Sequence, residues 1–145
     1  MTGMGAFLHG ARWNAPGQYV VYASGNLSLA MLEVLVHLDD AEALWAVPHV
    51  YHSLRWPERI IATLDRSALP KGWNDRPETL VSQAVGNEWL ERQASAVLAV
   101  PSVVTPPELR FQPLYMNYPI NPRHPDFAAV AVGQVYGLEW DTRLR

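Results

Sequence analysis

The apolar positions in the first quarter of the chain predict one strand followed by one helix. Residues 18–24 (QYVVYAS) are rich in β-branched and aromatic side chains, which favours a strand. Residues 24–26 (SGN) favour a turn, and their polar side chains can cap a helix that begins next. Residues 27–38 (LSLAMLEVLVHL) are apolar on almost every side, so we expect a helix that is buried on most sides. Residues 1–17 show no clear period and predict irregular structure.

The rest of the chain predicts several short strands and a second helix. Residues 78–92 have helical spacing, and the expected buried side consists of Leu80, Val81, Ala84, Val85, Trp89 and Leu90. The remaining expected elements are two strands within 44–64, a turn at 70–74, a strand over 95–100 and 102–105 bent at Pro101, a proline-rich loop at 106–126 and a late strand at 127–135. The pattern predicts a single compact α+β domain with more strands than helices.

Composition narrows the class of protein. The chain has 145 residues, of which 49% are hydrophobic and 17% are charged, so we expect one folded domain rather than disorder or a coiled coil. No apolar run is long enough to span a bilayer, and no signal peptide opens the chain. The absence of cysteine excludes thiol catalysis, disulfides and thiolate zinc sites. We expect a cytoplasmic protein that binds no membrane.

The charge pattern argues against a nucleic-acid partner. The formal net charge is −3, Lys71 is the only lysine, and the arginines are scattered along the chain. Proteins that bind nucleic acids usually present a basic face to the phosphates. Direct nucleic-acid binding is therefore not expected.

Glu33 is the most unusual residue of the predicted first helix. Its neighbours one turn away, apart from His37, are apolar. Burying a carboxylate costs several kcal/mol unless it is paired and hydrogen-bonded. Two interpretations remain open from the pattern alone: a functional carboxylate, or a structural ion pair with His37 or an arginine.

Arg12 and Tyr22 are weaker candidates when each is considered alone. Arg12 is flanked by small residues that let a ligand approach, and its guanidinium can bind phosphate or carboxylate through two hydrogen bonds. An arginine in a solvated loop and a strand tyrosine that only packs are the commoner cases. His49 and His52 would lie on opposite faces of a strand, so no metal site is predicted.

Several motifs in a fixed order resemble the RES domain family, named for an Arg, a Glu and a Ser. Arg12 matches its Arg, Tyr22 follows ten residues later, Glu33 eleven residues after that, and Ser102 matches its Ser. The matching segments are GARWNAPG (10–17), VVYAS (20–24), LEVLVHL (32–38), GNEWL (86–90), VPSVV (100–104), NPRHPDF (121–127) and WDTRL (140–144).

The resemblance implies a fold, an activity and a partner. It implies one RES domain over residues 1–145, similar to ADP-ribosyltransferases of the diphtheria-toxin type and lacking the strand that usually precedes the Arg12 motif. It implies the toxin of a type II toxin–antitoxin pair, with an Xre-type antitoxin as partner. NAD⁺ would be the substrate, and no cofactor or metal is implied.

The resemblance also assigns roles to four residues. Glu33 would stabilise positive charge on the ribose as nicotinamide leaves. Arg12 would bind the pyrophosphate, Tyr22 would contact the nicotinamide ring, and Ser102 would bind the substrate or orient Glu33. Transfer of ADP-ribose to water or phosphate would deplete NAD⁺; the alternative is mono-ADP-ribosylation of a protein. An RNA-targeting toxin, or a non-catalytic module that only binds its antitoxin, is the third class.

Overall fold

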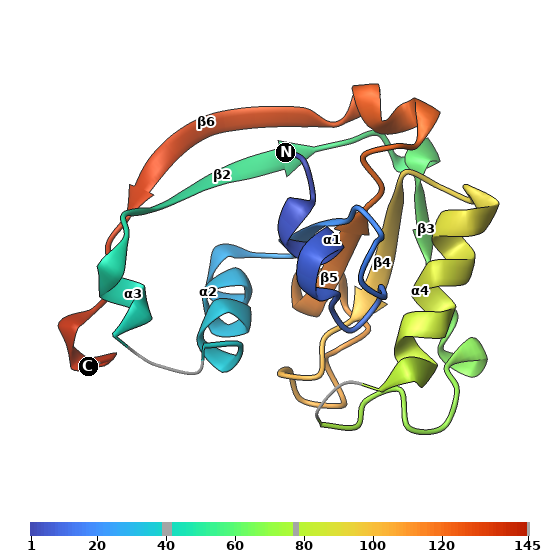
Figure 1. Cartoon of the computed structure of the whole chain (residues 1–145), viewed down its shortest axis with the longest axis horizontal. Helices are drawn as coiled ribbons and strands as arrows, with labels where there is room; N and C mark the ends of the chain where they lie inside the picture. The colour runs from blue at the N-terminus through green and yellow to red at the C-terminus, as the bar shows by residue number, and fades with distance from the viewer. Residues whose placement is uncertain (39–41, 77–78, 145) are drawn as a thin grey trace.

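The protein folds around two β-sheets whose strand pairs are mostly antiparallel. The computed structural model describes residues 1–38, 42–76 and 79–144. The larger sheet has the strand order β1-β5-β4-β3, and only the β3–β4 pair is parallel. Its strands are β1 (Val21–Ser24), β5 (Met116–Ile120), β4 (Val97–Pro101) and β3 (Ile61–Thr63). β2 (His49–Arg55) and β6 (Ala131–Leu138) form a second, two-stranded sheet that extends away from the first (Figure 1). The predicted α+β class is confirmed.

Four α-helices and several short 3-10 turns connect these strands within the described residues. The helices are α1 (Met4–His9), α2 (Leu27–Val36), α3 (Ala43–Ala46) and α4 (Leu80–Arg92). The 3-10 turns are Glu58–Ile60, Arg66–Ala68, Pro113–Tyr115, Pro125–Ala129 and Thr142–Leu144. None of the described helices has the length and apolar character needed to cross a membrane.

Strand β4 is the centre of the core because both of its faces are covered. Its side chains alternate, as the pleat of a strand requires. Val97 and Ala99 join one apolar cluster with residues of β5 and with Leu54 of β2. Leu98 and Val100 join a second cluster with Trp13 and helix α4. All five residues of β4 are buried, which explains why its sequence is almost continuously apolar.

Helix α4 covers one face of the larger sheet (Figure 1), and its buried side differs in part from the prediction. Trp89 and Leu90 are buried as expected, but Leu80 is 81% exposed, and Val81 and Ala84 are also exposed. Ser82 and Gly86 are buried instead, and Gly86 faces the backbone of Trp13. Residue 78, the predicted first residue, lies outside the described residues.

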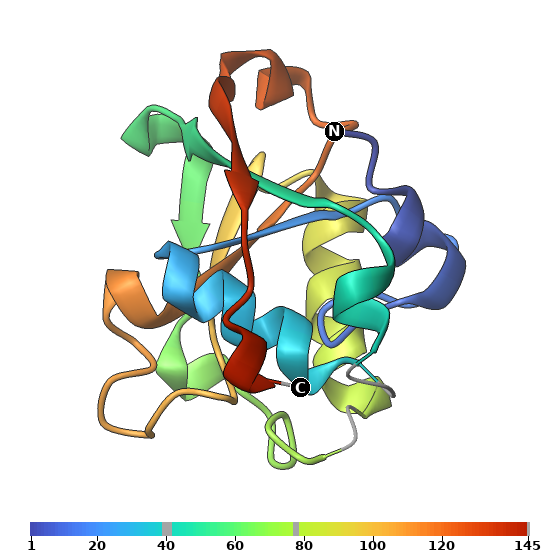
Figure 2. The same cartoon turned by 90° about the vertical axis from the view of Figure 1, so that its left-hand side faces the viewer.

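Helix α2 forms where it was predicted but is less buried than expected. Asn26 caps it by accepting a hydrogen bond from the backbone N–H of Leu29 (2.9 Å). Leu29 is the only residue of α2 that is buried; the apolar side chains that remain exposed are Leu27, Leu32, Val34 and Val36. The helix lies beside β1, on the opposite side of the molecule from α4 (Figures 1 and 2), so only one side of it meets the core.

Other expectations need correction at the level of whole elements. The predicted loop at 106–126 contains β5, a central strand of the larger sheet, and the irregular 1–17 segment contains α1. Two strands do form within 44–64, together with the short helix α3. The strand expected to continue over 102–105 ends at Pro101, and the late strand begins at Ala131 rather than at residue 127.

Candidate active site

A cleft of about 730 Å³ opens between α2, the loop after α1 and the ends of three strands of the larger sheet. All four residues to which the RES resemblance assigns roles line it: Arg12, Tyr22, Glu33 and Ser102. They come from a loop, from β1, from α2 and from the residue directly after β4. The fold thus brings together side chains that lie up to 90 positions apart in the chain.

Glu33 is held in this cleft by hydrogen bonds from two neutral side chains. The Ser102 hydroxyl donates to Glu33 Oε1 at 2.6 Å, and the Asn117 amide donates to the same oxygen at 2.5 Å. The carboxylate is half-buried and forms no ion pair with any described residue. His37, one predicted partner, bonds instead to the backbone carbonyl of Glu33 through Nδ1 (2.7 Å). The structural ion-pair interpretation is therefore wrong.

Asn117 and Ser24 are site residues that the sequence analysis did not identify. Asn117 lies on β5 directly opposite Ser24 on β1, and the Ser24 hydroxyl donates to Asn117 Oδ1 at 2.8 Å. Both residues line the cleft. The signal for Asn117 is a polar residue inside an apolar strand, and it was missed because residues 116–120 were predicted to be loop.

Arg12 lies on a loop that helix α4 holds in place. Gln83 Nε2 donates to the Ala11 carbonyl (3.1 Å), and Asn87 Oδ1 accepts from the Ala15 N–H (3.0 Å). The guanidinium of Arg12 in turn donates through Nη1 to the carbonyls of Trp73 (2.9 Å) and Asp75 (3.0 Å). These bonds fix the position of the guanidinium at the wall of the cleft.

Tyr22 presents its ring to the cleft while its hydroxyl is anchored. The ring is 37% exposed, and the hydroxyl donates to Asn14 Oδ1 at 2.8 Å. Asn14 is completely buried and donates to the carbonyls of Ala6 and Ala15 (3.0 Å each). A buried amide with both ends bonded fixes the ring at one wall of the cleft.

A second arginine lines the same cleft and was also missed by the sequence analysis. Arg76 donates to the backbone carbonyl of Val103, and neither Arg76 nor its neighbour Arg110 forms an ion pair with a described residue. Arg110 donates to the Thr105 carbonyl (2.8 Å). Burial, and then the nearby charge of Arg76, lowers the pKa of Arg110. Arg76 and Arg110 therefore lie close enough to repel each other, and the charge of Glu108 partly offsets this on Arg110.

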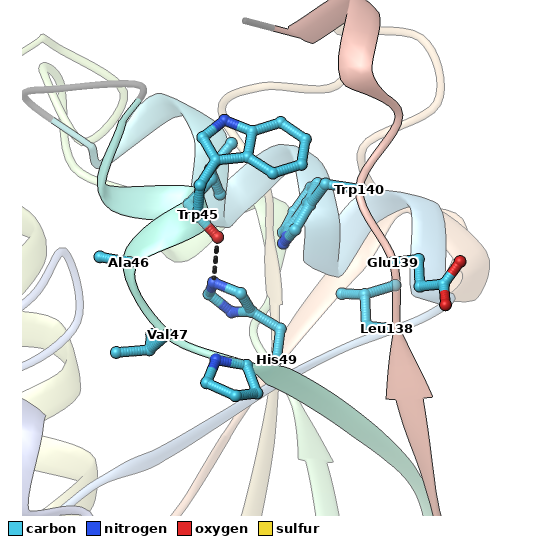
Figure 3. A pocket seen from close by; sticks show the side chains of 9 residues that line it. Trp45, Ala46, Val47, His49, Leu138, Glu139 and Trp140 are labelled. Atoms are coloured by element: carbon cyan, nitrogen blue, oxygen red, sulfur yellow. Dashed lines mark hydrogen bonds between the residues drawn. The ribbon is translucent and has the colours of Figure 1, made fainter.

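A smaller hollow of about 450 Å³ lies at the far end of the two-stranded sheet, away from these residues. Trp45, His49 and Trp140 face one another across it (Figure 3). His49 Nε2 lies 3.1 Å from the Leu44 carbonyl. In the described parts of the chain, no three His, Asp or Glu side chains lie close enough together to bind one metal ion.

Comparison with known proteins identifies the family. The model of the RES domain matches residues 1–141. The "Prs ADP-ribosylating toxin" of Sphingobium sp. is 33% identical over 147 residues, covering 99% of this chain and 86% of that protein. The "Toxin Res" of Yersinia enterocolitica is 33% identical over 145 residues, covering 99% and 90%. The crystal structure of the M. tuberculosis MbcT–MbcA toxin–antitoxin complex contains a chain with the same fold, with a TM-score of 0.70 at 16% identity, covering 95% of this chain and 76% of that one. With its arginine, glutamate and serine gathered in one cleft, this chain belongs to the RES domain family.

Proposed function

We propose that this protein is the toxin of a bacterial toxin–antitoxin pair and that it cleaves the bond between nicotinamide and ribose in NAD⁺. The observation that carries the proposal is a half-buried carboxylate, Glu33, in the same cleft as two arginines and a tyrosine ring. The membership of the RES family and the name of the Sphingobium relative support an enzyme that uses ADP-ribose chemistry.

The chemistry needs one well-placed negative charge. The C1′–N1 bond breaks with its electron pair moving to the cationic ring, so nicotinamide departs neutral and needs no general acid. Positive charge then develops on the ribose. A carboxylate fixed beside it in a site of low dielectric stabilises that charge, and Glu33 fills this role. Water or phosphate attacks C1′ and, in the case of water, releases a proton.

The other cleft residues bind the rest of the substrate. The guanidinium groups of Arg12 and Arg76 match the charge of the pyrophosphate. The ring of Tyr22, held by Asn14, supplies a flat apolar wall for the nicotinamide. Ser102 acts through Glu33 by donating to its Oε1.

A second candidate is transfer of ADP-ribose to a protein side chain. The name "Prs ADP-ribosylating toxin", carried by a relative that is 33% identical over nearly the whole chain, favours it. The two candidates share the first bond cleavage and differ only in the group that attacks C1′. We favour water or phosphate as the acceptor, because depletion of NAD⁺ requires no recognition surface for a target protein.

Replacement of Glu33 tests the shared step. Glu33→Gln keeps the shape of the side chain and removes its charge, so we expect kcat for nicotinamide release to fall about 10²- to 10³-fold. Glu91→Gln, on the exposed side of α4, is the matched control and should keep full activity. Full turnover by a folded Glu33→Gln protein would contradict the assignment.

The acceptor is identified in the same assay. The purified protein is incubated with NAD⁺ alone, with phosphate, and with cell lysate. ADP-ribose, ADP-ribose phosphate or a labelled protein band then distinguishes the three acceptors. No nicotinamide under any condition would overturn the NAD⁺ proposal in favour of an RNA-targeting toxin or a non-catalytic module.

An antitoxin is the proposed protein partner, and the cytoplasm is the proposed place of action. The structural neighbour was crystallised as a toxin–antitoxin complex. We expect an Xre-type antitoxin to inhibit by covering the cleft or inserting a segment into it. Addition of the cognate antitoxin should abolish nicotinamide release, and inhibition should weaken when NAD⁺ is present first.

A further inference from the structure

We infer that Asn117, set in place by Ser24, is a positioning residue that fixes the catalytic orientation of Glu33. The inference rests on the proposed function, in which Glu33 stabilises charge on the ribose. It concerns a residue outside the Arg, Tyr, Glu and Ser positions of the family resemblance. The evidence is a chain of hydrogen bonds that crosses from β1 through β5 to α2.

The two oxygens of Glu33 are in different environments. Oε1 accepts hydrogen bonds from both Ser102 Oγ (2.6 Å) and Asn117 Nδ2 (2.5 Å). No described residue donates a hydrogen bond to Oε2. The protein therefore anchors the carboxylate through one oxygen and leaves the other for the substrate. A ribose hydroxyl, or the charge that develops at C1′, is the chemical group that Oε2 would meet.

Two donors are needed to fix a carboxylate on a flexible stem. A glutamate side chain loses substantial rotamer freedom when it is held in one conformation. Ser102 alone leaves rotation about its own hydrogen bond, whereas a second donor from a different strand removes that freedom. Reaction rates depend steeply on such alignment, because small misplacements of a reacting group are costly.

The direction of the Asn117 amide follows from the chemistry of its neighbours. An ionised carboxylate can only accept hydrogen bonds, so the NH₂ group must face Glu33. The amide oxygen then faces Ser24, whose hydroxyl donates to it at 2.8 Å. The opposite orientation would place two acceptors against each other. The carboxylate thereby selects the amide orientation, and the hydroxyl of Ser24 stabilises it by donating to the amide oxygen.

Strand pairing places Ser24 and Asn117, and Ser102 follows directly on the end of β4. Ser24 and Asn117 are direct partners in the antiparallel β1–β5 ladder, and Asn117 also pairs with Val100 on β4. Ser102 follows β4 two residues after Val100 and is only 1% exposed. Sites built on strands are held more rigidly than sites built on loops. The central sheet is thus the support of the carboxylate.

The first test separates binding from catalysis. Asn117→Ala should lower kcat for nicotinamide release about 10- to 100-fold, the range typical of residues that orient a functional group. The KM for NAD⁺ should stay within about threefold, because Asn117 acts on Glu33 rather than on the pyrophosphate. Gln134→Ala, an exposed amide on β6, is the matched control and should change neither value.

Ser24 provides a second variant that alters the site more mildly. Ser24→Ala removes the donor that orients Asn117 and should lower kcat about 3- to 10-fold. Ser24→Thr keeps the hydroxyl in a residue that suits a strand and should restore kcat to near the starting value. A purely structural role for Ser24 would not predict recovery by the hydroxyl-bearing variant.

A double-mutant cycle decides whether Asn117 works through Glu33. In a Glu33→Ala background, the further change Asn117→Ala should cost no more activity, because the carboxylate it positions is absent. Unchanged kcat in the single Asn117→Ala variant, or additive losses in the cycle, would overturn the inference while leaving the proposed function intact. An unaltered protein that releases no nicotinamide would overturn both.

Discussion

At Tyr118, burial of the side chain affects the ionisation of its hydroxyl. Tyr118 lies on β5 within the core, against Trp56 at a ring distance of 5.5 Å, and its hydroxyl donates to the Pro113 carbonyl at 2.9 Å. Burial raises the pKa of this phenol above its ordinary value. The folded protein therefore keeps Tyr118 neutral at a pH where the unfolded chain ionises it.

This linkage predicts an alkaline loss of stability that depends on one hydroxyl. The contribution is present below about pH 10 and is lost as the pH rises from there through the raised folded-state pKa. Tyr118→Phe should cost about 1 kcal/mol in the free energy of unfolding at pH 7. The same substitution should also make the free energy of unfolding less dependent on pH above 10. Urea unfolding at pH 7 and at a pH above 10 measures both effects. An alkaline slope unchanged in Tyr118→Phe would contradict the argument.

Helix α4 acts as the support of the Arg12 loop. A Cβ atom on Gly86 would lie 1.7 Å from the Trp13 carbonyl oxygen, so the helix can approach this loop only through a glycine. The same close approach lets Gln83 and Asn87 bond to the loop on either side of Arg12. A residue with no role in chemistry therefore determines where Arg12, the proposed ligand of the pyrophosphate, lies.

Gly86→Ala tests this support. The added methyl group must push α4 away from the loop, and we expect a loss of about 1–3 kcal/mol in the free energy of unfolding. The KM for NAD⁺ should rise in the same variant, because Arg12 moves with its loop. Gly5→Ala in α1 is the control: its Cβ would meet nothing within 4 Å, so stability should be kept or slightly raised. A Gly86→Ala protein as stable as the original would show that the contact is not tight.

Only some of the helices and strands could be predicted from the sequence. Helices α2 and α4, strand β1 and the two strands between α3 and α4 follow from local patterns of apolar residues. Strand β5 does not, because Pro119 removes a backbone donor from a strand that lies between two others. Its pairs with β4 are at Ile120, Asn117 and Met116, and β4 makes no pair at Pro119 itself. Tertiary pairing with β1 stabilises what the local sequence disfavours.

The residues of the candidate site could also be predicted only in part. Glu33 was identifiable on physical grounds, since a carboxylate in an apolar helix needs partners. The identity of those partners was not, because Ser102 and Asn117 lie 69 and 84 residues away from it. The expected burial of α2 was wrong for a related reason: an apolar helix pattern does not reveal whether a core element or a cleft lies beside it.

At the scale of the whole molecule, charge is distributed unevenly. The chain has a formal net charge of −3, yet Arg12 and Arg76 line the cleft and Arg110 lies near Arg76. Such a local concentration of positive charge attracts an anionic substrate against the background of the acidic chain, and salt weakens the attraction.

Arg76→Gln tests whether this positive charge attracts the substrate. We expect the KM for NAD⁺ to rise several-fold, and its dependence on salt between about 0.01 and 0.15 M to become weaker. Arg92→Gln is the control, because Arg92 pairs with Glu88 on the exposed side of α4, remote from the cleft. Equal salt dependence in the Arg76→Gln variant and the unaltered protein would show that the substrate does not sense this charge.

The long separation between Glu33 and its two donors has a consequence during synthesis. A growing chain makes the carboxylate early, but Ser102 and Asn117 are added 69 and 84 residues later. Until β5 has left the ribosome and paired with β1, Glu33 lacks the hydrogen bond from Asn117. Under the proposed function, a growing chain therefore gains a fully held Glu33 only towards the end of its synthesis.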